Sequence, residues 1–535
     1  MSEGGDRFTG SAWSPLRLPV YRALWIATLV SNIGTWIHDV SAGWLMTSLA
    51  TSPMLVALVQ AATTLPAFLL ALPAGALADL VDRRRLLIGL QLAMGITATL
   101  LALCTIAGFT TPGILLAATF VMGVGSATSA PAYQAIVPGL VPKSELSAAI
   151  TLNGVGINLA RAIGPAVGGV LVTLLGAGWS FLLNAASFLA VIAALVSWRP
   201  APAAAGALPA ERFMGAMRAG LRYAKASPPF RLTVARSCLF FIPASAIWAL
   251  LPLLVRRDLG LGPGSYGLVL TAVGAGALAG AFLLPKLKDR LDGDAKLLWG
   301  QVLIGLALIV FALVHDLPSV MAAGLGAGLG WIAVLPTLSL AAQSALPDWV
   351  RARGLSLFLM AMMGSLTAGS LIWGQLASQT SVRTTLLVAA VLAVAGALVG
   401  RRLRVGGTGD LDLSPSQHWA DPVLAHADAD TRGPVIVTVE YRVAEGATPG
   451  FVAALDDLGR ERRRDGAVSW GLFEDAADPG RWLEHFVEES WLDHRRHHAR
   501  VTRGDAEIQA RIRDLLRPGT EPIVTHWLAP SRRTA

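Results

Sequence analysis

Residues 54–107 read MLVALVQAATTLPAFLLALPAGALADLVDRRRLLIGLQLAMGITATLLALCTIA, which is two apolar runs separated by a short turn with three consecutive arginines. Each run has about the 20 apolar residues that a helix needs to cross a bilayer core roughly 30 Å thick. Inside a bilayer, backbone polar groups must be satisfied within the segment, so both runs predict helices. The stretch therefore predicts a membrane hairpin with its arginines in the connecting loop.

The same pattern fills the first 400 residues, where twelve apolar runs of spanning length occur. The whole chain of 535 residues is 54% apolar and only 15% charged, whereas soluble domains carry about 25% charge. This composition excludes a disordered chain, a nucleic-acid-binding protein and an ordinary soluble enzyme, and it predicts an all-α membrane protein with twelve transmembrane helices. The runs lie near 21–48, 54–78, 86–107, 113–133, 148–175, 179–197, 232–255, 265–285, 297–315, 318–342, 354–378 and 383–400.

Lys and Arg are distributed unevenly between the loops. Loops on one side of the membrane contain sixteen of them, and loops on the other side contain only Arg256, Arg257 and Arg383. Because basic residues are enriched in cytoplasmic loops, we expect both termini in the cytoplasm of a cell carrying this protein in its inner or plasma membrane. The N-terminal residues show no removable signal peptide. Two cysteines, Cys104 and Cys238, are too few for a disulfide framework.

The two halves of the apolar region repeat. Several residues recur after an offset of 210 positions, which predicts two pseudo-symmetric six-helix halves, 1–198 and 232–400, joined by a cytoplasmic linker, 199–231. Parallel repeats of this kind place a substrate cavity at their interface near the bilayer midplane. The alternative is chance similarity between hydrophobic segments. The matching residues are Pro53, Leu58, Val59, Asp79 and Asp82 with Pro263, Leu268, Val269, Asp289 and Asp292.

The turn between the second and third runs combines Gly75 and Asp79 with the basic cluster Arg83, Arg84 and Arg85. An acid and a basic cluster at a helix end can pair with a neighbouring helix end and hold one conformation, so we expect this turn to act in conformational gating. The alternative is that it only anchors the loop in the cytoplasm. A degenerate second copy is formed by Asp289 and Arg290.

Gly75-x-Leu77-x-Asp79 followed by basic residues resembles the signature loop of the major facilitator superfamily, although Leu80 and Asp82 depart from it. Together with segments 36–44, 129–134 and 158–169, it resembles the branch that contains the enterobactin exporter and the transmembrane secretion effectors. The resemblance implies an exporter of a small siderophore-, drug- or secondary-metabolite-like molecule. It also implies an ion gradient as the energy source and alternating access by rocking halves.

Two charges of opposite sign lie inside apolar runs, Asp39 in the first and Arg161 in the fifth. Charges at that depth are costly and usually functional. At helical spacing, Asp39 shares a face with Trp36, and Arg161 shares one with Asn158, so we expect both faces to border a common cavity. Asp39 would bind and release the coupling proton, or either charge would hold a polar substrate. The alternative is a static ion pair. His38 is a weaker proton carrier, and Gln60 and Asn184 are further candidates for the lining.

Gly164-Pro165-x-x-Gly168-Gly169 resembles the antiporter motif of the superfamily, with Ala160 as an imperfection. Pro165 removes a backbone donor and predicts a helix kink, while the glycines predict close helix contact. No phosphate-binding loop or nucleophile–base pair is visible, so we expect no cofactor and no direct use of ATP; a proton gradient drives antiport instead. The expected partners are a small-molecule substrate and membrane lipid, with no nucleic acid.

The tail is polar. Residues 401–432 are a linker and 433–535 a cytoplasmic α+β domain in ferredoxin-like order, with strands at 435–443, 467–474, 481–488 and 522–528 and helices at 449–464 and 490–515. The tail resembles small dimeric barrels related to antibiotic-biosynthesis monooxygenases. We expect a dimerisation or regulatory module and not an enzyme. A bifunctional exporter with a monooxygenase-like tail, or a non-transporting membrane sensor, are the alternatives.

Three histidines in the tail raise the question of a metal. His494 and His498 have the i, i+4 spacing of a metal site, but they stand beside Arg495, Arg496 and Arg500. Positive neighbours oppose a cation, so we expect a solvated helix face and no metal.

Overall fold

The computed structural model describes residues 13–198, 213–287, 290–405 and 432–529. The chain divides into two compact units. The first comprises Met1–Pro209, Val234–Ser339 and Phe358–Arg404, and the second comprises Ala210–Thr233, Leu340–Leu357 and Val405–Ala535. The expected linkers 199–231 and 401–432 lie partly outside the described residues, and the expected domain boundaries remain predictions.

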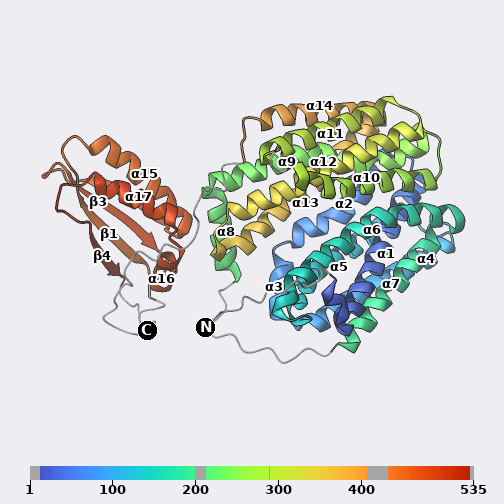
Figure 1. The fold of residues 1–535 in the computed structure, drawn as a ribbon, viewed down its shortest axis with the longest axis horizontal. Helices are drawn as coiled ribbons and strands as arrows, with labels where there is room; N and C mark the ends of the chain where they lie inside the picture. The colour runs from blue at the N-terminus through green and yellow to red at the C-terminus, as the bar shows by residue number, and fades with distance from the viewer. Residues whose placement is uncertain (1–12, 199–212, 288–289, 406–431, 530–535) are drawn as a thin grey trace, which may run out of the picture. The chain divides into compact units, whose positions relative to one another are not determined.

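The membrane-type helices follow the expected order (Figure 1). In the first half they are α1 (Pro19–Leu49), α2 (Pro53–Leu70), α3 (Pro73–Leu80), α4 (Arg83–Ile106), α5 (Pro112–Ile136), α6 (Leu146–Leu175) and α7 (Ala177–Ser197). A short amphipathic helix, α8 (Phe213–Ala226), follows. The second half contains α9 (Pro228–Leu253), α10 (Pro263–Leu283), α11 (Gly293–Leu313), α12 (Leu317–Ser344), α13 (Asp348–Gln379) and α14 (Val382–Gly400).

Among the described residues, eleven helices are long and apolar enough to cross a membrane, one fewer than expected. The missing one is the first run, 21–48. It forms α1, which has 31 residues, but Asn32, His38, Asp39 and several Ser and Thr lower its hydropathy. The second run, 54–78, is also divided. α2 ends at Leu70 and α3 begins at Pro73, whose missing N–H cannot continue the hydrogen-bond ladder of the preceding helix.

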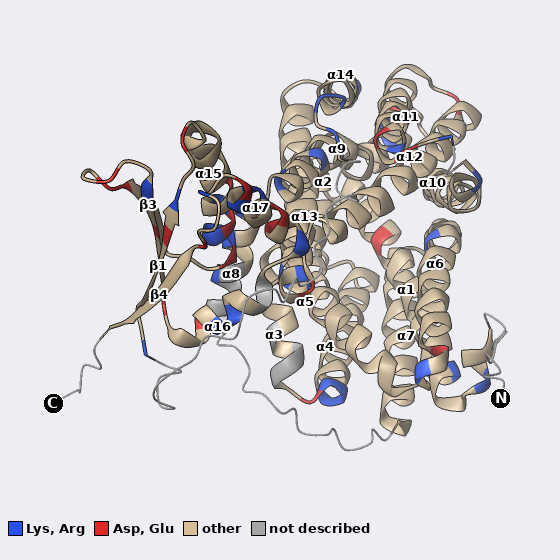
Figure 2. Cartoon of the chain, turned by 60° about the vertical axis from the view of Figure 1, so that its left-hand side comes forward, with Lys and Arg blue, Asp and Glu red and all other residues tan. Residues whose placement is uncertain are grey.

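Several pairs of helices pack closely within the first unit. α1 packs on α6 and α7, α4 packs on α7, and α2 packs on α5, whereas α11 packs on α14. Across the halves, α6 packs against α10, and α2 contacts α13 through Thr64 and Thr367. In Figure 2 these helices carry few charged residues, and most of those lie near helix ends. The charge pattern therefore agrees with a bilayer-embedded bundle whose loops are polar.

The C-terminal domain contains one antiparallel sheet with strand order β2-β3-β1-β4. Phe451 and Leu455 of α15, Trp491 of α16 and Ile512 of α17 pack on one face of the sheet with the inward side chains of β1. The elements are β1 (Val435–Arg442), α15 (Thr448–Asp465), β2 (Ser469–Glu474), β3 (Arg481–Glu488), α16 (Trp491–Arg500), α17 (Arg503–Asp514) and β4 (Ile523–Leu528).

The helical character expected over 490–515 is present as two helices, because Thr502 caps α17 by accepting from the Asp505 N–H while the Asp505 carboxylate accepts from the Thr502 N–H. This reciprocal box starts a new helix. The expectation that the histidines of α16 form a solvated face is wrong. His494 and His497 are 1% and 2% exposed, because both rings turn toward the buried carboxylate of Glu488.

Candidate functional site

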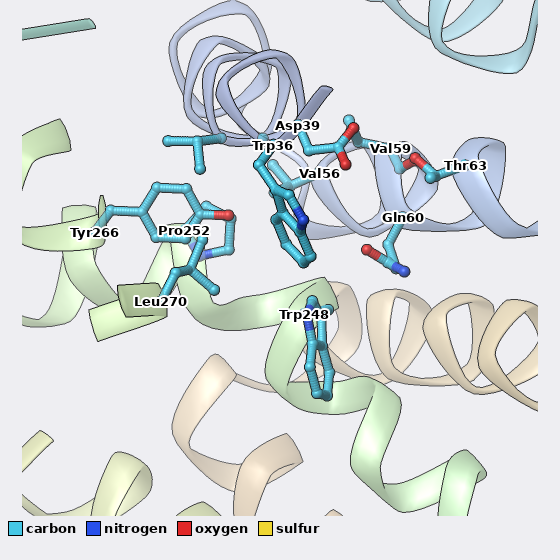
Figure 3. A pocket seen from close by; sticks show the side chains of 12 residues that line it. Trp36, Asp39, Val56, Val59, Gln60, Thr63, Trp248, Pro252, Tyr266 and Leu270 are labelled. Atoms are coloured by element: carbon cyan, nitrogen blue, oxygen red, sulfur yellow. The ribbon is translucent and has the colours of Figure 1, made fainter. Parts of the chain in front are cut away.

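Two cavities lie between helices of the two halves. The first has a volume of about 190 Å³ and is bordered by Asp39 and Trp36 of α1, Gln60 of α2, Trp248 of α9 and Tyr266 of α10 (Figure 3). Figure 3 shows the indoles of Trp36 and Trp248 next to each other, with the Gln60 amide beside them. Pockets that hold drug-sized ligands are larger, about 300–1,000 Å³, so this cavity must widen to accept such a molecule.

The second cavity contains the other expected charge. It has a volume of about 130 Å³ and is bordered by Arg161 of α6 and Trp331 of α12. Trp36, Gln60, Trp248 and Leu270 line both cavities, so Asp39 and Arg161 belong to adjoining spaces. The structure records no ion pair between these two residues among the described side chains.

Three other expected lining residues border neither cavity. The His38 ring is buried against Phe181, with ring centroids 4.8 Å apart, and neither ring nitrogen has a hydrogen-bond partner among the described residues. Asn158 donates to the Gly154 carbonyl of its own helix at 3.0 Å. Asn184 is fully buried and accepts from the hydroxyl of Ser187. His38 and Asn184 lie in contacts between helices, and Asn158 bonds within its own helix, so none of the three lines either cavity.

Apart from Trp36, the aromatic residues around the cavities were not predicted. Trp248 and Trp331 have ring centroids 4.4 Å apart, and Tyr266 of the first cavity stacks on Trp44, which lies behind it, with centroids 6.2 Å apart. Aromatic residues inside apolar runs resemble ordinary lipid-facing or core residues in a sequence. A weak signal exists for Trp36 alone, which lies one turn from Asp39 on the same helix.

The Gly-Pro segment of α6 packs closely on both halves. A Cβ at Gly164 would collide with the Cβ of Trp36, and a Cβ at Gly168 would lie 3.1 Å from the Ile37 Cα. A Cβ at Gly169 would lie 2.9 Å from the Cα of Gly267 on α10. Pro165 lies inside α6 and has no N–H to donate to the carbonyl of Arg161. The segment therefore lies at the helix crossing beside the cavities.

The basic turn binds helix ends. Arg84 donates to the carbonyls of Leu195 and Val196 near the end of α7 at 2.7 and 2.8 Å, and Arg83 donates to the Ala135 carbonyl of α5 at 3.4 Å. Cations are favourable at helix C-termini, where unpaired carbonyls gather. The N–H of Arg85 is bound by Asp82, which caps α4.

The remaining residues expected to act in gating are Gly75, Asp79, Asp289 and Arg290. A Cβ at Gly75 would meet no atom within 4 Å. Arg290 is exposed. Asp289 and the Asp79 side chain lie outside the described part of the structure, so their expected pairing stays a prediction.

A second set of contacts, which the sequence did not indicate, joins the halves at the loops expected outside the cell. Arg256 donates to the hydroxyl of Thr47 at 2.9 Å, and Arg257 donates to the Thr51 carbonyl at 2.7 Å. The N–H of Met54 donates to the Ser378 hydroxyl at 3.0 Å. These three bonds, called here the outer latch, connect the end of α1 and the start of α2 with the second half.

Comparison with known sequences places these features in a family. A family model described as Transmembrane secretion effector matches residues 10–534. The Staphyloferrin A transporter of Staphylococcus aureus is 27% identical, over 52% of this chain and 70% of that protein. The Multidrug efflux pump Tap of Mycobacterium tuberculosis is 24% identical, over 74% and 96%. The Enterobactin exporter EntS of Shigella boydii is 26% identical, over 39% and 50%.

Solved transporters share the fold of the helical body. An inward-facing, unoccupied bacterial homolog of the human lysosomal transporter Spinster aligns with a TM-score of 0.57 at 16% identity, over 74% of this chain and 98% of that chain. A POT family transporter in complex with 5-aminolevulinic acid aligns with a TM-score of 0.59 at 14% identity, over 72% and 96%. At such identities the likeness concerns the fold alone.

Proposed function

The chain belongs to the transmembrane secretion effector family of major facilitator transporters, and from this membership and the two cavities we propose that it exports a small molecule by proton-coupled alternating access. It is a multi-pass membrane protein with eleven candidate spans among its described residues. We place it in the inner or plasma membrane, with α1 as a twelfth span and both termini in the cytoplasm. The observation that carries the proposal is the position of Asp39 and Arg161 in adjoining cavities between the halves.

The cargo class follows from the relatives and from the lining. Staphyloferrin A, enterobactin and drugs are the molecules in the relatives' names. The lining combines the aromatic rings of Trp36, Trp248 and Trp331 with the charges of Asp39 and Arg161. Such a lining suits an amphipathic molecule that carries both an aromatic or apolar part and a polar group.

The coupling step uses the carboxyl group of Asp39. In a dry cavity a carboxyl is favoured in its neutral form, and water entering from one side favours its ion. Asp39 therefore binds a proton on one side of the membrane and releases it on the other as the cavity changes access. Arg161 supplies the counter-charge to the carboxylate when the two cavities join. No resident cofactor is needed for this cycle.

The outer latch supports an inward-facing or nearly closed state. Its hydrogen bonds, from Arg256, Arg257 and the N–H of Met54, hold the expected outer ends of the halves together. A cargo entering from the cytoplasm would bind while this latch is closed. Its release outside requires the latch to break, which is the gating step we propose.

For the tail we propose a ferredoxin-like regulatory domain that pairs with a second copy. Its strand order β2-β3-β1-β4 supports this fold. The sheet face opposite the helices exposes Ile436, Phe473, Leu483, Ile523 and Trp527 by 40–62%, which suits a self-complementary apolar contact. Light scattering of the purified full chain tests this pairing. Trp527→Lys should convert a dimer to a monomer, and a monomeric wild type would contradict it.

Metabolite profiling tests the exporter function even while the cargo is unidentified. The medium of the native bacterium should contain at least one compound that disappears when the gene is deleted and returns with the wild-type gene. The Asp39→Asn gene should not restore it. If the medium is unchanged and no compound accumulates in the deleted cells, the proposal is wrong.

A further inference from the structure

Three histidines of the C-terminal domain meet between α16 and β4. His494 and His498 lie one turn apart on α16, and His526 lies on β4 opposite Val437, whose side chain is buried beneath the helices. One ring nitrogen from each histidine lies within 4.8 Å of one from each of the others. The ring centroid of His494 is 4.7 Å from that of His498 and 4.7 Å from that of His526.

His494 presents a buried nitrogen without a partner. Its side chain is 1% exposed, and its Nδ1 lies 2.7 Å from a carboxylate oxygen of Glu488. A carboxylate accepts hydrogen bonds, so Nδ1 carries the proton and Nε2 carries a lone pair. Nε2 of His494 and Nε2 of His526 are both buried without a hydrogen-bond partner among the described residues. A buried polar atom without a partner is unfavourable, so these two nitrogens are suited to binding a ligand placed between them.

Glu488 supplies the orientation that a metal-binding histidine needs. Ligating histidines commonly donate their second ring N–H to a carboxylate, which fixes both the tautomer and the ring. The Glu488 side chain is 1% exposed and contacts the Nδ1 atoms of His494 and His497 with its two oxygens. Its negative charge is therefore held close to the cluster, where it offsets the charge of a cation.

The neighbouring arginines oppose a cation less than their sequence positions indicate. Arg495 is exposed, and Arg496 pairs with Asp493 at 3.1 Å. Residues one and two positions after His494 point away from the face that His494 and His498 share. The cluster therefore faces the sheet and not the basic surface of α16.

We propose that His494, His498 and His526 bind a divalent transition-metal ion of the zinc class. Imidazole ligands suit Zn²⁺, Cu²⁺ and Ni²⁺ but not Mg²⁺ or Ca²⁺. Tetrahedral zinc with Zn–N bonds of about 2.0–2.1 Å separates its ligand nitrogens by about 3.3 Å, so the rings draw together by at most about 1.5 Å on binding. The ion ties α16 to β4, and its fourth position is open to water. Glu488 is the positioning residue.

The test uses the full-length protein in detergent, purified through a tag without histidines and stripped with EDTA. Incubation with Zn²⁺ followed by gel filtration and elemental analysis should give one zinc per chain. His526→Ala and His494→Ala should lose it. The matched control is His485→Ala, which removes a histidine from the opposite face of β3, where it stacks on Phe473, and should retain one zinc. Glu488→Gln should weaken binding by about 10- to 100-fold.

Two further measurements separate metal binding from simple loss of folding. Co²⁺ added to the stripped wild type should give the visible absorption of a four-coordinate site, and Mg²⁺ should not compete. Zn²⁺ should raise the unfolding temperature of the wild type and not that of His526→Gln, a variant that keeps a polar side chain. Absence of zinc from the wild type, or equal zinc in His526→Ala and wild type, would overturn the site. Neither result bears on export, so the proposed function is tested separately.

Discussion

Asp39 is the residue whose carboxyl group couples export to the proton gradient in the proposed cycle. Asp39→Asn keeps the size of the side chain but cannot exchange a proton, so gradient-driven export in proteoliposomes should fall about tenfold or more, equivalent to at least ~1.4 kcal/mol in the barrier. His38→Gln is the control, because the His38 ring lies against Phe181 and borders neither cavity; it should export within about twofold of wild type. Equal export by Asp39→Asn and wild type would remove Asp39 from the coupling step.

Individual charges in apolar runs could be predicted from the sequence, but their surroundings could not. Asp39 and Arg161 are charged residues among apolar neighbours in the sequence, and both line cavities. His38 and Asn184 are also polar residues among apolar neighbours, yet they lie in the contact between α1 and α7. Helical spacing assigns a residue to a face of its own helix, and only the packing decides which neighbour meets that face. Trp331 was not predicted, because an aromatic residue in an apolar run does not differ in polarity from its neighbours.

At the scale of elements, long periodic segments were predictable and their interruptions were not. The break before Pro73 and the box of Thr502 and Asp505 divide segments that have continuous helical periodicity. Both breaks depend on a few hydrogen bonds that compete with the helix ladder. The close crossing of α6 and α10 at Gly169 and Gly267 was predicted only as close contact, because one chain does not name the partner helix.

Gly169 tests that crossing. A Cβ at Gly169 meets backbone atoms of Gly267 and Pro263 at 2.9 and 3.0 Å, which cannot yield without separating α6 from α10. Gly169→Ala should therefore lower stability by about 1–3 kcal/mol and reduce export. Gly154→Ala on the same helix meets nothing within 4 Å and is the matched control. Thermal unfolding in detergent compares the two, and similar midpoints would contradict the tight crossing.

The contact of α15 with α17 contains an acid pair that predicts a pH dependence. Burial, followed by the charge of Asp505, raises the pKa of Glu461 to about 9, while Arg464 acts in the opposite direction. Asp465 adds to the rise. Because the folded-state pKa is higher than the unfolded one, the domain's stability is greatest below about pH 4.5 for this group and declines as pH rises toward 9.

Glu461→Gln replaces the titrating carboxyl with an amide that does not titrate in this range. The loss of stability with rising pH should therefore be much smaller in this variant. The measurement is hydrogen–deuterium exchange of α15 and α17 in the full chain between pH 5 and 9, corrected for intrinsic rates. In the wild type, protection should decrease across this range, and in Glu461→Gln it should stay nearly constant. A parallel decline in both proteins would show that another group dominates.

At the scale of the molecule, the sequence predicted the two-half transporter because hydropathy, loop charge and the 210-residue repeat agree. The outer latch was not predictable. Arg256 and Arg257 appeared only as exceptions to the positive-inside pattern, and their partners Thr47 and Thr51 lie over 200 positions away. The conformational state that a transporter adopts depends on such small sets of contacts between its halves.

The latch should control opening toward the outside. In Arg256→Ala/Arg257→Ala, the hydrogen bonds that the two arginines donate to the first half are lost, so the outward-open population should rise. Spin labels at Phe109→Cys and Thr380→Cys, in a background without Cys104 and Cys238, should report a longer distance by pulsed electron resonance. Arg383→Ala, an exposed arginine in an expected outer loop, is the control. An unchanged distance in the double variant would exclude the latch as a gate.

The measurement that tests the account most directly is the accessibility of the cavity from each side of the membrane. Gln60 lines both cavities, so Gln60→Cys, in the background without Cys104 and Cys238, can be labelled with an impermeant maleimide in right-side-out and inside-out vesicles. Alternating access predicts that Gln60→Cys is labelled from both sides. A pH gradient should shift the ratio of labelling from the two sides, and the same gradient should not shift this ratio when Asp39→Asn is also present. Labelling from only one side under every gradient, or from neither, would contradict the account.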